Sequence, residues 1–280
     1  MADITKQRGR VPFIALVPFL LITFGIAWGI LGLYLFLPRW MPATFGDLSG
    51  QHPLFYVAVY APAIAAFSVV GYHGGRHGLV AFICRIAIWR GPWTWYAFLL
   101  VGIPLLFYAG AAIKGNLLAE LMPQHAPIGL LLAMALMAIK GPIEEFGWRG
   151  LALPLLQRRY TPFVAGLMLG VVWGLWHLPA FLLSGTPQSA WSFTPFLAGS
   201  IAVSVIITPM FNAFRGSILL PALFHFQLIN PVWPDAQPYD TIGFVLAAVL
   251  VCWMNRASMF SRGSAAITVI PGGQQGNAPL

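Results

Sequence analysis

The chain has 280 residues, of which 59% are hydrophobic and only 8% are charged, and its mean hydropathy is +0.80. Because soluble domains carry about 25% charged residues, this composition excludes a soluble globular protein. Its apolar runs approach the roughly 20 residues that a helix needs to cross hydrocarbon, and they lack the alternating pattern of an outer-membrane barrel. The sequence therefore predicts an all-α, polytopic membrane protein.

Eight apolar stretches predict about eight transmembrane helices that form a bundle. In chain order they cover residues 12–37, 54–72, 94–113, 127–146, 161–180, 192–210, 216–230 and 241–255. A shorter stretch at 77–89, flanked by Arg76 and Arg90, predicts a helix lying in the membrane interface, and Leu151 to Tyr160 are a candidate for a second one. One transmembrane domain would cover residues 1–260. The tail at 261–280, rich in Gly, Gln, Ser and Pro, is predicted to be disordered.

The positions of the basic residues predict the orientation in the membrane. With the N-terminus in the cytoplasm, 12 of the 15 Lys and Arg residues fall on the cytoplasmic side, Arg39 and Lys114 fall on the other side, and Lys140 lies within a span. This bias follows the positive-inside rule and predicts an integral membrane protein with both termini in the cytoplasm. The net charge of +8 is then explained by topology and contact with the anionic lipid bilayer, so a nucleic acid partner is not expected.

An adjacent pair of acids marks the candidate site. Only seven carboxylates occur in the chain, and Glu144 and Glu145 are the only ones between Glu120 and Asp235. The pair lies within or at the end of an apolar span, where a charged group bears a desolvation cost and is usually functional.

Two cations lie one helical turn from the acids, Arg149 after Glu145 and Lys140 before Glu144. A purely structural interpretation is that they form two internal ion pairs that make a helix end tolerable in the membrane. A proline and a glycine flank the acids, however, and would loosen the helix. The functional interpretation is therefore preferred.

Of the six histidines, only His177 and His225 lie within predicted spans. A lone histidine on an apolar helix is usually a packing residue, but two of them together with a diacid indicate chemistry. Three glycines spaced by four residues, Gly166, Gly170 and Gly174, predict a face on which another helix packs closely. The same face could also bind a helix of a membrane-protein partner.

Two hydrolytic schemes fit the diacid and the histidines. Glu144, Glu145, His177 and His225 could ligate a divalent metal such as zinc, although no His-Glu-x-x-His helix is present. Alternatively, a glutamate could take a proton from water while histidines stabilise the oxyanion, without a metal. Both schemes hydrolyse an amide bond, and the metal-free one is mildly preferred. Serine and thiol protease motifs are absent from the sequence.

Three ordered motifs resemble those of the CAAX prenyl protease type II and bacteriocin-processing (CPBP, ABI-like) family of intramembrane proteases. They are Glu144-Glu145-Phe-Gly-Trp-Arg149-Gly150, Trp173-Gly-Leu-Trp-His177 and Phe224-His225, within a core at 140–230. The resemblance implies a helical bundle with a polar cavity that is open toward the cytoplasm and the membrane. One acid would activate water, Arg149 would brace the pair, and His177 and His225 would line the site.

The motifs depart from the family at two positions. Trp173 stands where the family has Phe, and the third motif has Ile229 where an Asn is expected four residues after the histidine. Asn230 is one residue further on, which rotates a side chain by about 100° around a helix. Asn230 is therefore a candidate site residue only if the helix bulges or ends before it, as Pro231 favours. Asn212 is a weaker substitute.

The sequence thus predicts an intramembrane endopeptidase that cleaves a peptide or protein substrate, lipidated or not, near the cytoplasmic face. Two other functions remain open. The chain could be a non-proteolytic binding or scaffold protein with the same fold, or a proton-coupled transporter that uses the buried acids for coupling.

Overall fold

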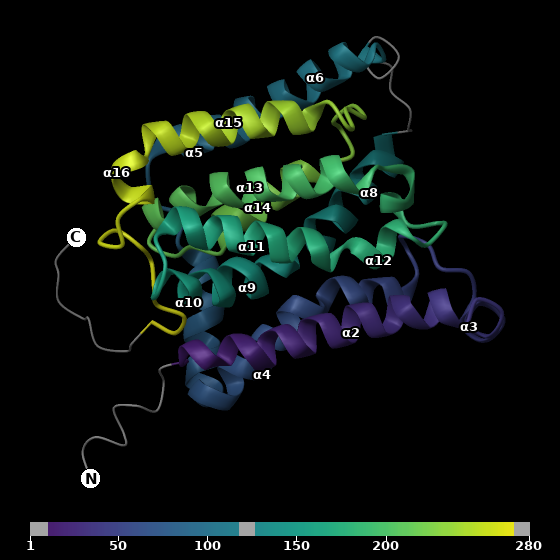
Figure 1. Ribbon diagram of the computed structural model, residues 1–280, viewed down its shortest axis with the longest axis horizontal. Coiled ribbons are helices and arrows are strands. Elements are labelled where there is room, and N and C mark those ends of the chain that lie inside the picture. Colours follow the sequence, from purple (N-terminus) through teal and green to yellow (C-terminus); the bar gives the residue numbers. More distant parts are fainter. Residues whose placement is uncertain (1–10, 118–126, 272–280) are drawn as a thin grey trace.

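The computed structural model describes residues 11–117 and 127–271. Within these ranges the chain forms helices joined by turns, and no strand occurs. The helices lie side by side along the long axis of the molecule (Figure 1). The prediction of an all-helical, polytopic membrane protein is confirmed.

Eight helical segments run in alternating directions through the described part of the chain. They are α2 (Leu16–Phe36), α4 (Pro53–Ile83), α5 with α6 (Trp93–Ala97 and Ile103–Lys114), α8 to α10, α11 with α12 (Pro162–Trp176 and Leu178–Phe181), α13 (Phe193–Ala213), α14 (Leu219–Leu228) and α15 (Asp240–Met254). Shorter elements are η1 (Phe13–Ala15), α3 (Trp40–Phe45), η2 (Cys84–Ala87), the π-helical η3 (Phe98–Gly102), η6 (Pro187–Ala190) and α16 (Arg256–Met259).

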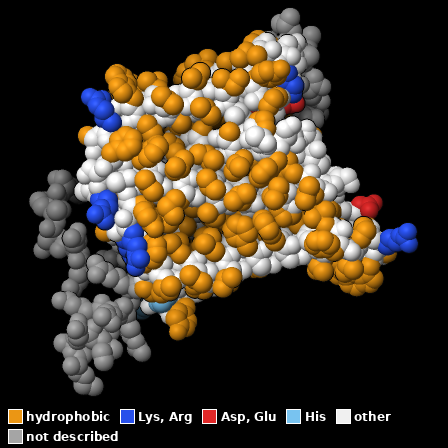
Figure 2. All heavy atoms as spheres, in the orientation of Figure 1, with side chains coloured by type: hydrophobic (Ala, Val, Ile, Leu, Met, Phe, Trp, Pro, Cys, Tyr) orange, Lys and Arg blue, Asp and Glu red, His pale blue; other side chains and the backbone are white. Residues whose placement is uncertain are grey.

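Four helical stretches of the described residues are long and apolar enough to cross a membrane, namely Phe13–Phe36, Pro53–Ala87, Trp93–Lys114 and Phe193–Ala213. The outer surface agrees with this assignment. Hydrophobic side chains cover the middle of the face in Figure 2, whereas basic side chains lie toward its two ends. Ile14, Leu100 and Leu246 are each about two-thirds exposed. Such contiguous apolar surface is suited to lipid rather than to water.

The fourth of the eight helical segments, called the fourth crossing below, is longer than the sequence predicts. It continues from α8 (Pro127–Lys140) through η4 (Pro142–Glu144), α9 (Glu145–Gly147), the π-helical η5 (Trp148–Ala152) and α10 (Leu153–Gln157). The candidate interfacial helix from Leu151 is therefore wrong, because residues 151–157 are all buried in the bundle as part of this crossing. The acid pair consequently lies deep inside the crossing and not at its end.

The segment at 77–89, predicted to be an interfacial helix, continues α4 and η2 beyond a break in the helix. Helix α4 breaks at Gly75, whose φ of 56° and ψ of −157° are not helical and are accessible to glycine. The segment after the break does not lie wholly at the surface. Arg85 is buried and donates hydrogen bonds to the carbonyl oxygens of Gly216 (2.9 Å), Gly150 (2.6 Å) and Val269 (3.0 Å). This arginine therefore ties four parts of the chain together.

The glycine face predicted on the fifth span packs against α13. A Cβ at Gly170 would lie 2.6 Å from Cα of Ile201, and one at Gly166 would lie 2.6 Å from Oγ1 of Thr208. The two helices therefore approach each other at backbone distance, as small residues in membrane helices permit. Because α13 already fills this face, it is not free for a partner helix.

Part of the tail that the sequence predicts to be disordered is held against the bundle. The backbone N–H of Ala266 donates to Asn212, the Arg158 side chain donates to the carbonyl oxygen of Ile267, and Val269 is buried. Arg158 also donates to the carbonyl oxygen of Val11, so the first and last described residues meet at one end of the molecule. Residues 272–280 lie outside the described residues.

The contact between α11 and α13 gives a prediction about stability. Gly170→Ala should lower the free energy of unfolding by roughly 1–3 kcal/mol, because the added methyl group collides with backbone. Gly29→Ala is the matched control, since no atom lies within 4 Å of its added Cβ. That control should be neutral or slightly stabilising, because alanine has the higher helix propensity. Thermal unfolding in detergent measures the stability of both variants. Equal stabilities would contradict the close packing of α11 against α13.

Candidate active site

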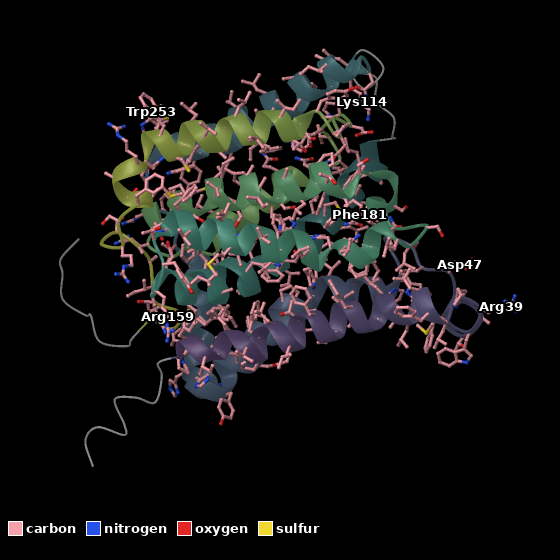
Figure 3. All side chains as sticks on the ribbon, in the orientation of Figure 1. Arg39, Asp47, Lys114, Arg159, Phe181 and Trp253 are labelled. Carbon is pink, nitrogen blue, oxygen red and sulfur yellow. The ribbon has the colours of Figure 1, made fainter. Side chains whose placement is uncertain are left out.

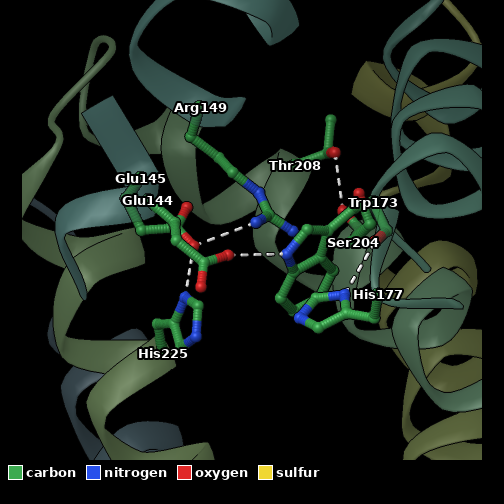
Figure 4. Close-up of polar contacts among 8 residues, drawn as sticks. All are labelled: Glu144, Glu145, Arg149, Trp173, His177, Ser204, Thr208 and His225. Atoms are coloured by element: carbon green, nitrogen blue, oxygen red, sulfur yellow. Dashed lines mark hydrogen bonds and ion pairs between the residues drawn. The ribbon is translucent and has the colours of Figure 1, made fainter. Parts of the chain in front are cut away.

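The two acids differ in their surroundings although they are adjacent in sequence. Glu145 is fully buried, and its Oε1 accepts hydrogen bonds from Nη1 of Arg149 at 3.0 Å and from Nδ1 of His225 at 2.8 Å (Figure 4). Oε2 of Glu144 accepts a hydrogen bond from Nε1 of Trp173 at 3.0 Å. Glu145 is therefore engaged by two cationic or ionisable groups, whereas Glu144 is held by a neutral donor.

Arg149 lies on the π-helical turn η5, one turn after Glu145, and its side chain is fully buried. Its guanidinium carbon lies 4.6 Å from the ring centroid of Trp173, a cation–π distance. The predicted ion pair between Glu145 and Arg149 is thus present, and Trp173 joins the arginine to Glu144. π-Helical turns inside α-helices occur frequently at functional sites.

The second ion pair considered in the sequence, between Lys140 and Glu144, is not formed. Nζ of Lys140 instead donates to the carbonyl oxygen of Gly50 at 2.6 Å and lies about 5 Å from the ring centroids of Phe55 and Tyr56. The break between α8 and η4 separates Lys140 from the acid, so the spacing of one regular turn does not apply.

His225 lies on α14 and faces Glu145 through Nδ1. Because a carboxylate oxygen acts as the acceptor, we assign the proton of this contact to Nδ1, which leaves Nε2 on the other side of the ring. The ring packs on the backbone of Gly141, where a Cβ would lie 2.7 Å from Nε2. A glycine after α8 therefore makes room for this histidine.

His177 follows the last residue of α11 and is oriented by its own helix. Its Nδ1 lies 2.8 Å from the carbonyl oxygen of Trp173, and its ring packs edge-on against Trp176 and Phe196. It contacts neither acid directly. Trp173 lies between the two histidine rings, with centroids 5.6 Å from His177 and 5.5 Å from His225.

Asn230 lies beyond the end of α14 at Leu228, as the proline after it favours. Its amide donates to Gln227, and its Oδ1 accepts the backbone N–H of Val232, so it holds the turn. It borders the same cavity as Glu144 but has no hydrogen bond to either acid. Asn212 is not part of the site, because it bonds Gln157 and Ala266 at the other end of the bundle.

These residues surround a cavity of about 590 Å³. Glu144, Trp173, His177 and His225 line it, whereas Glu145 and Arg149 lie behind this wall. Its remaining walls include side chains that the sequence did not single out, among them Gln51, Gln188, Trp191, Phe196 and Asp240. They come from loops and helix starts without a motif, so only the fold reveals them.

The four candidate metal ligands do not form a metal-binding arrangement. In the described ranges, no group of three or more His, Cys, Asp and Glu side chains is close enough to hold an ion. Nδ1 of His177 is turned to a backbone carbonyl, and one oxygen of Glu145 serves both Arg149 and His225. The donor set therefore does not fit a resident metal.

The cavity opens away from the end where the described termini meet. Its outer walls are the loops around Gln51, Gln188 and Pro234, which lie at the opposite end. The sequence predicts both cytoplasmic termini and cleavage near the cytoplasmic face. Because the structure puts the termini and the cavity mouth at opposite ends, these two predictions exclude each other.

The comparisons with known proteins agree with the motifs. Residues 124–230 match the family described as "Type II CAAX prenyl endopeptidase Rce1-like". The resemblance to the CPBP intramembrane-protease family is confirmed over this segment. The chain is also similar to the CAAX prenyl protease 2 of Methanococcus maripaludis, with 33% identity over 130 residues, covering 42% of this chain and 48% of the relative. It thus spans about half the length of the curated relative it matches.

The buried ion pair gives a prediction about stability. Arg149→Met should destabilise the fold by about 3–5 kcal/mol, because it leaves the Glu145 carboxylate buried without its counter-charge. Lys114→Met is the matched control, since it breaks the exposed pair with Asp235, which is worth about 0–1 kcal/mol. Chemical denaturation in mild detergent checks both. Equal, small effects would show that the Arg149 pair does not hold the site.

Proposed function

We propose that this protein is an intramembrane endopeptidase in which Glu144 activates a water molecule for hydrolysis of a peptide bond. The observation that carries the proposal is that the two adjacent acids lie in different surroundings. Glu145 lies behind the cavity wall and is engaged by Arg149 and His225, whereas Glu144 borders the cavity. The match to the CAAX endopeptidase family supports the reaction class.

In the proposed reaction, the Glu144 carboxylate takes a proton from water, and the water oxygen bonds to the scissile carbonyl carbon. The tetrahedral oxyanion then collapses, the C–N bond breaks, and the proton passes from Glu144 to the leaving amine. A positioned carboxylate base of this kind accelerates such a step by about 10²–10⁴-fold. The hydrogen bond from Trp173 to Oε2 fixes the direction in which Glu144 points.

The histidines would stabilise the oxyanion from the cavity wall. His225 is the better placed, because its Nδ1 is anchored to Glu145 and its protonated form would donate from Nε2. His177 would act from the other side of Trp173. Glu145 and Arg149 are then positioning residues, and Asn230 shapes the turn at the cavity rim.

The proposed substrate is a peptide or protein segment with an apolar or lipidated part. Much of the cavity wall is hydrophobic, with Leu31, Phe55, Phe107, Trp176 and Phe244 among its residues. The name of the Methanococcus maripaludis relative assigns that protein to prenylated CAAX substrates. A prenylated peptide is therefore the first probe to test.

We also place both termini in the cytoplasm. The exposed arginines at the end where the described termini meet are Arg76, Arg90, Arg159, Arg215, Arg256 and Arg262. Charged loops of this kind stay on the cytoplasmic side during insertion.

Cleavage by the purified protein in liposomes tests the function. A fluorogenic prenylated peptide and a pool of unmodified peptides should yield products with the wild type, and Glu144→Gln should reduce the rate by at least about 10²-fold. Asp240→Asn is the matched control, because it also removes a buried carboxylate from the cavity wall and should retain activity. A chelator should leave the rate unchanged.

Three outcomes would contradict the proposal. Full activity of Glu144→Gln would exclude it as the base, and loss of activity with chelator would require a metal. Absence of products from folded wild-type protein with both substrate sets would favour the non-proteolytic scaffold. Proton-coupled transport without cleavage would favour the transporter.

A further inference from the structure

The two ends of the molecule differ sharply in charge. Figure 3 shows Arg159 at one end and Arg39, Asp47 and Lys114 at the other. The first end carries the exposed arginines named above and, in the described ranges, no acid. At the second end, Lys114 forms an ion pair with Asp235 at 2.7 Å, and Arg39 is balanced by Asp47 in formal charge. Among the described residues, one end is therefore strongly basic, whereas the charges at the other end, called the neutral end below, balance.

The cavity reaches the neutral end. Gln51 precedes α4 and Gln188 lies on η6, and both line the cavity. The connection from α14 to α15 at residues 230–237 lines it as well, except for Val232. Contacts tie these loops together, since a Cβ at Gly50 would lie 3.2 Å from Pro187, and Lys140 donates to the carbonyl oxygen of Gly50. The mouth is thus built from loops of a single end.

A packed layer closes the cavity toward the basic end. Trp148, Arg149 and Leu151 on the fourth crossing are fully buried. Behind them, Arg85 fills the space between the carbonyl oxygens of Gly150, Gly216 and Val269. The C-terminal segment at 262–270 lies across this layer. In the described part of the chain, closely packed side chains therefore separate Glu144 from the basic end.

We infer that the cavity takes its substrate from the non-cytoplasmic side of the membrane. The inference rests on the proposed function and adds the side of access and the substrate class. The basic end is cytoplasmic by the positive-inside rule, so the neutral end that bears the mouth faces away from the cytoplasm. The substrate is then an extracytoplasmic peptide segment, or the extracytoplasmic end of a membrane-anchored protein.

The chemistry of the mouth fits a peptide that lies at the membrane surface. Trp191 stacks on Phe196, with ring centroids 6.2 Å apart, and Trp233 packs edge-on against Tyr108. Aromatic side chains of this kind are typical of the boundary between lipid and water. Because the charges of the described residues Arg39, Asp47, Lys114 and Asp235 sum to zero, we expect selection to depend on apolar and aromatic contacts and not on the net charge of the substrate.

Accessibility of single cysteines tests the side of access without requiring catalysis. The two native cysteines are first removed by Cys84→Ser and Cys252→Ala. Single cysteines are then introduced, one per variant, at Ser189 on η6, at Ser264 in the C-terminal segment and at Ser200 on the cavity wall. Intact cells expressing the full chain are treated with a small, membrane-impermeant thiol reagent, and labelling is compared with that of permeabilised cells. Ser189→Cys and Ser264→Cys are matched exposed serines at opposite ends.

The inference predicts that Ser189→Cys and Ser200→Cys react in intact cells, and that Ser264→Cys reacts only after permeabilisation. The reverse pattern would overturn it, because the mouth would then face the cytoplasm. Protection of Ser200→Cys in intact cells, followed by reaction after permeabilisation, would also overturn it. Since labelling does not depend on hydrolysis, a protein with this topology but no protease activity would refute the proposed function and leave the side of access established.

Discussion

The buried ion pair between Glu145 and Arg149 is the contact on which the rest of the site depends. Two charges inside an apolar bundle are tolerated only when each has a close partner, because removal from water costs several kcal/mol per ion in rough terms. Here the pair is also linked to His225 on α14 and, through the face of Trp173, to α11. Three crossings are therefore held in register by one network of polar contacts.

This network explains why two adjacent glutamates can have different roles. Consecutive residues on a helix point about 100° apart, so one acid can turn into the protein while the other faces the cavity. Glu145 is neutralised by Arg149 and orients His225, and Glu144 is aimed by the indole N–H of Trp173. In the same close-up, the Thr208 hydroxyl donates to the backbone carbonyl oxygen of Ser204 within α13 and makes no hydrogen bond to either acid (Figure 4).

Much of the fold and part of the site follow from the sequence. Hydropathy predicts the helices because the bilayer imposes their length, and the scarcity of acids draws attention to Glu144 and Glu145. The link from Lys140 to Gly50 and the course of the chain past Leu151 could not be predicted, since both depend on a local break and a π-helical turn. The cavity mouth could not be predicted either, because its loops carry no periodic pattern. The sequence also does not show that the cavity mouth and the described termini lie at opposite ends of the molecule, because this depends on how the helices are arranged in space.

The most direct test of this account compares the stability of Glu145→Gln with that of Glu144→Gln. Both changes remove one carboxylate charge and keep the shape of the side chain. If Glu145 is the structural member of the pair, Glu145→Gln should lower the denaturation midpoint in detergent markedly, because Arg149 loses its counter-charge, while Glu144→Gln should unfold close to the wild type. Equal stabilities, or a larger loss for Glu144→Gln, would contradict the division of roles between the two acids.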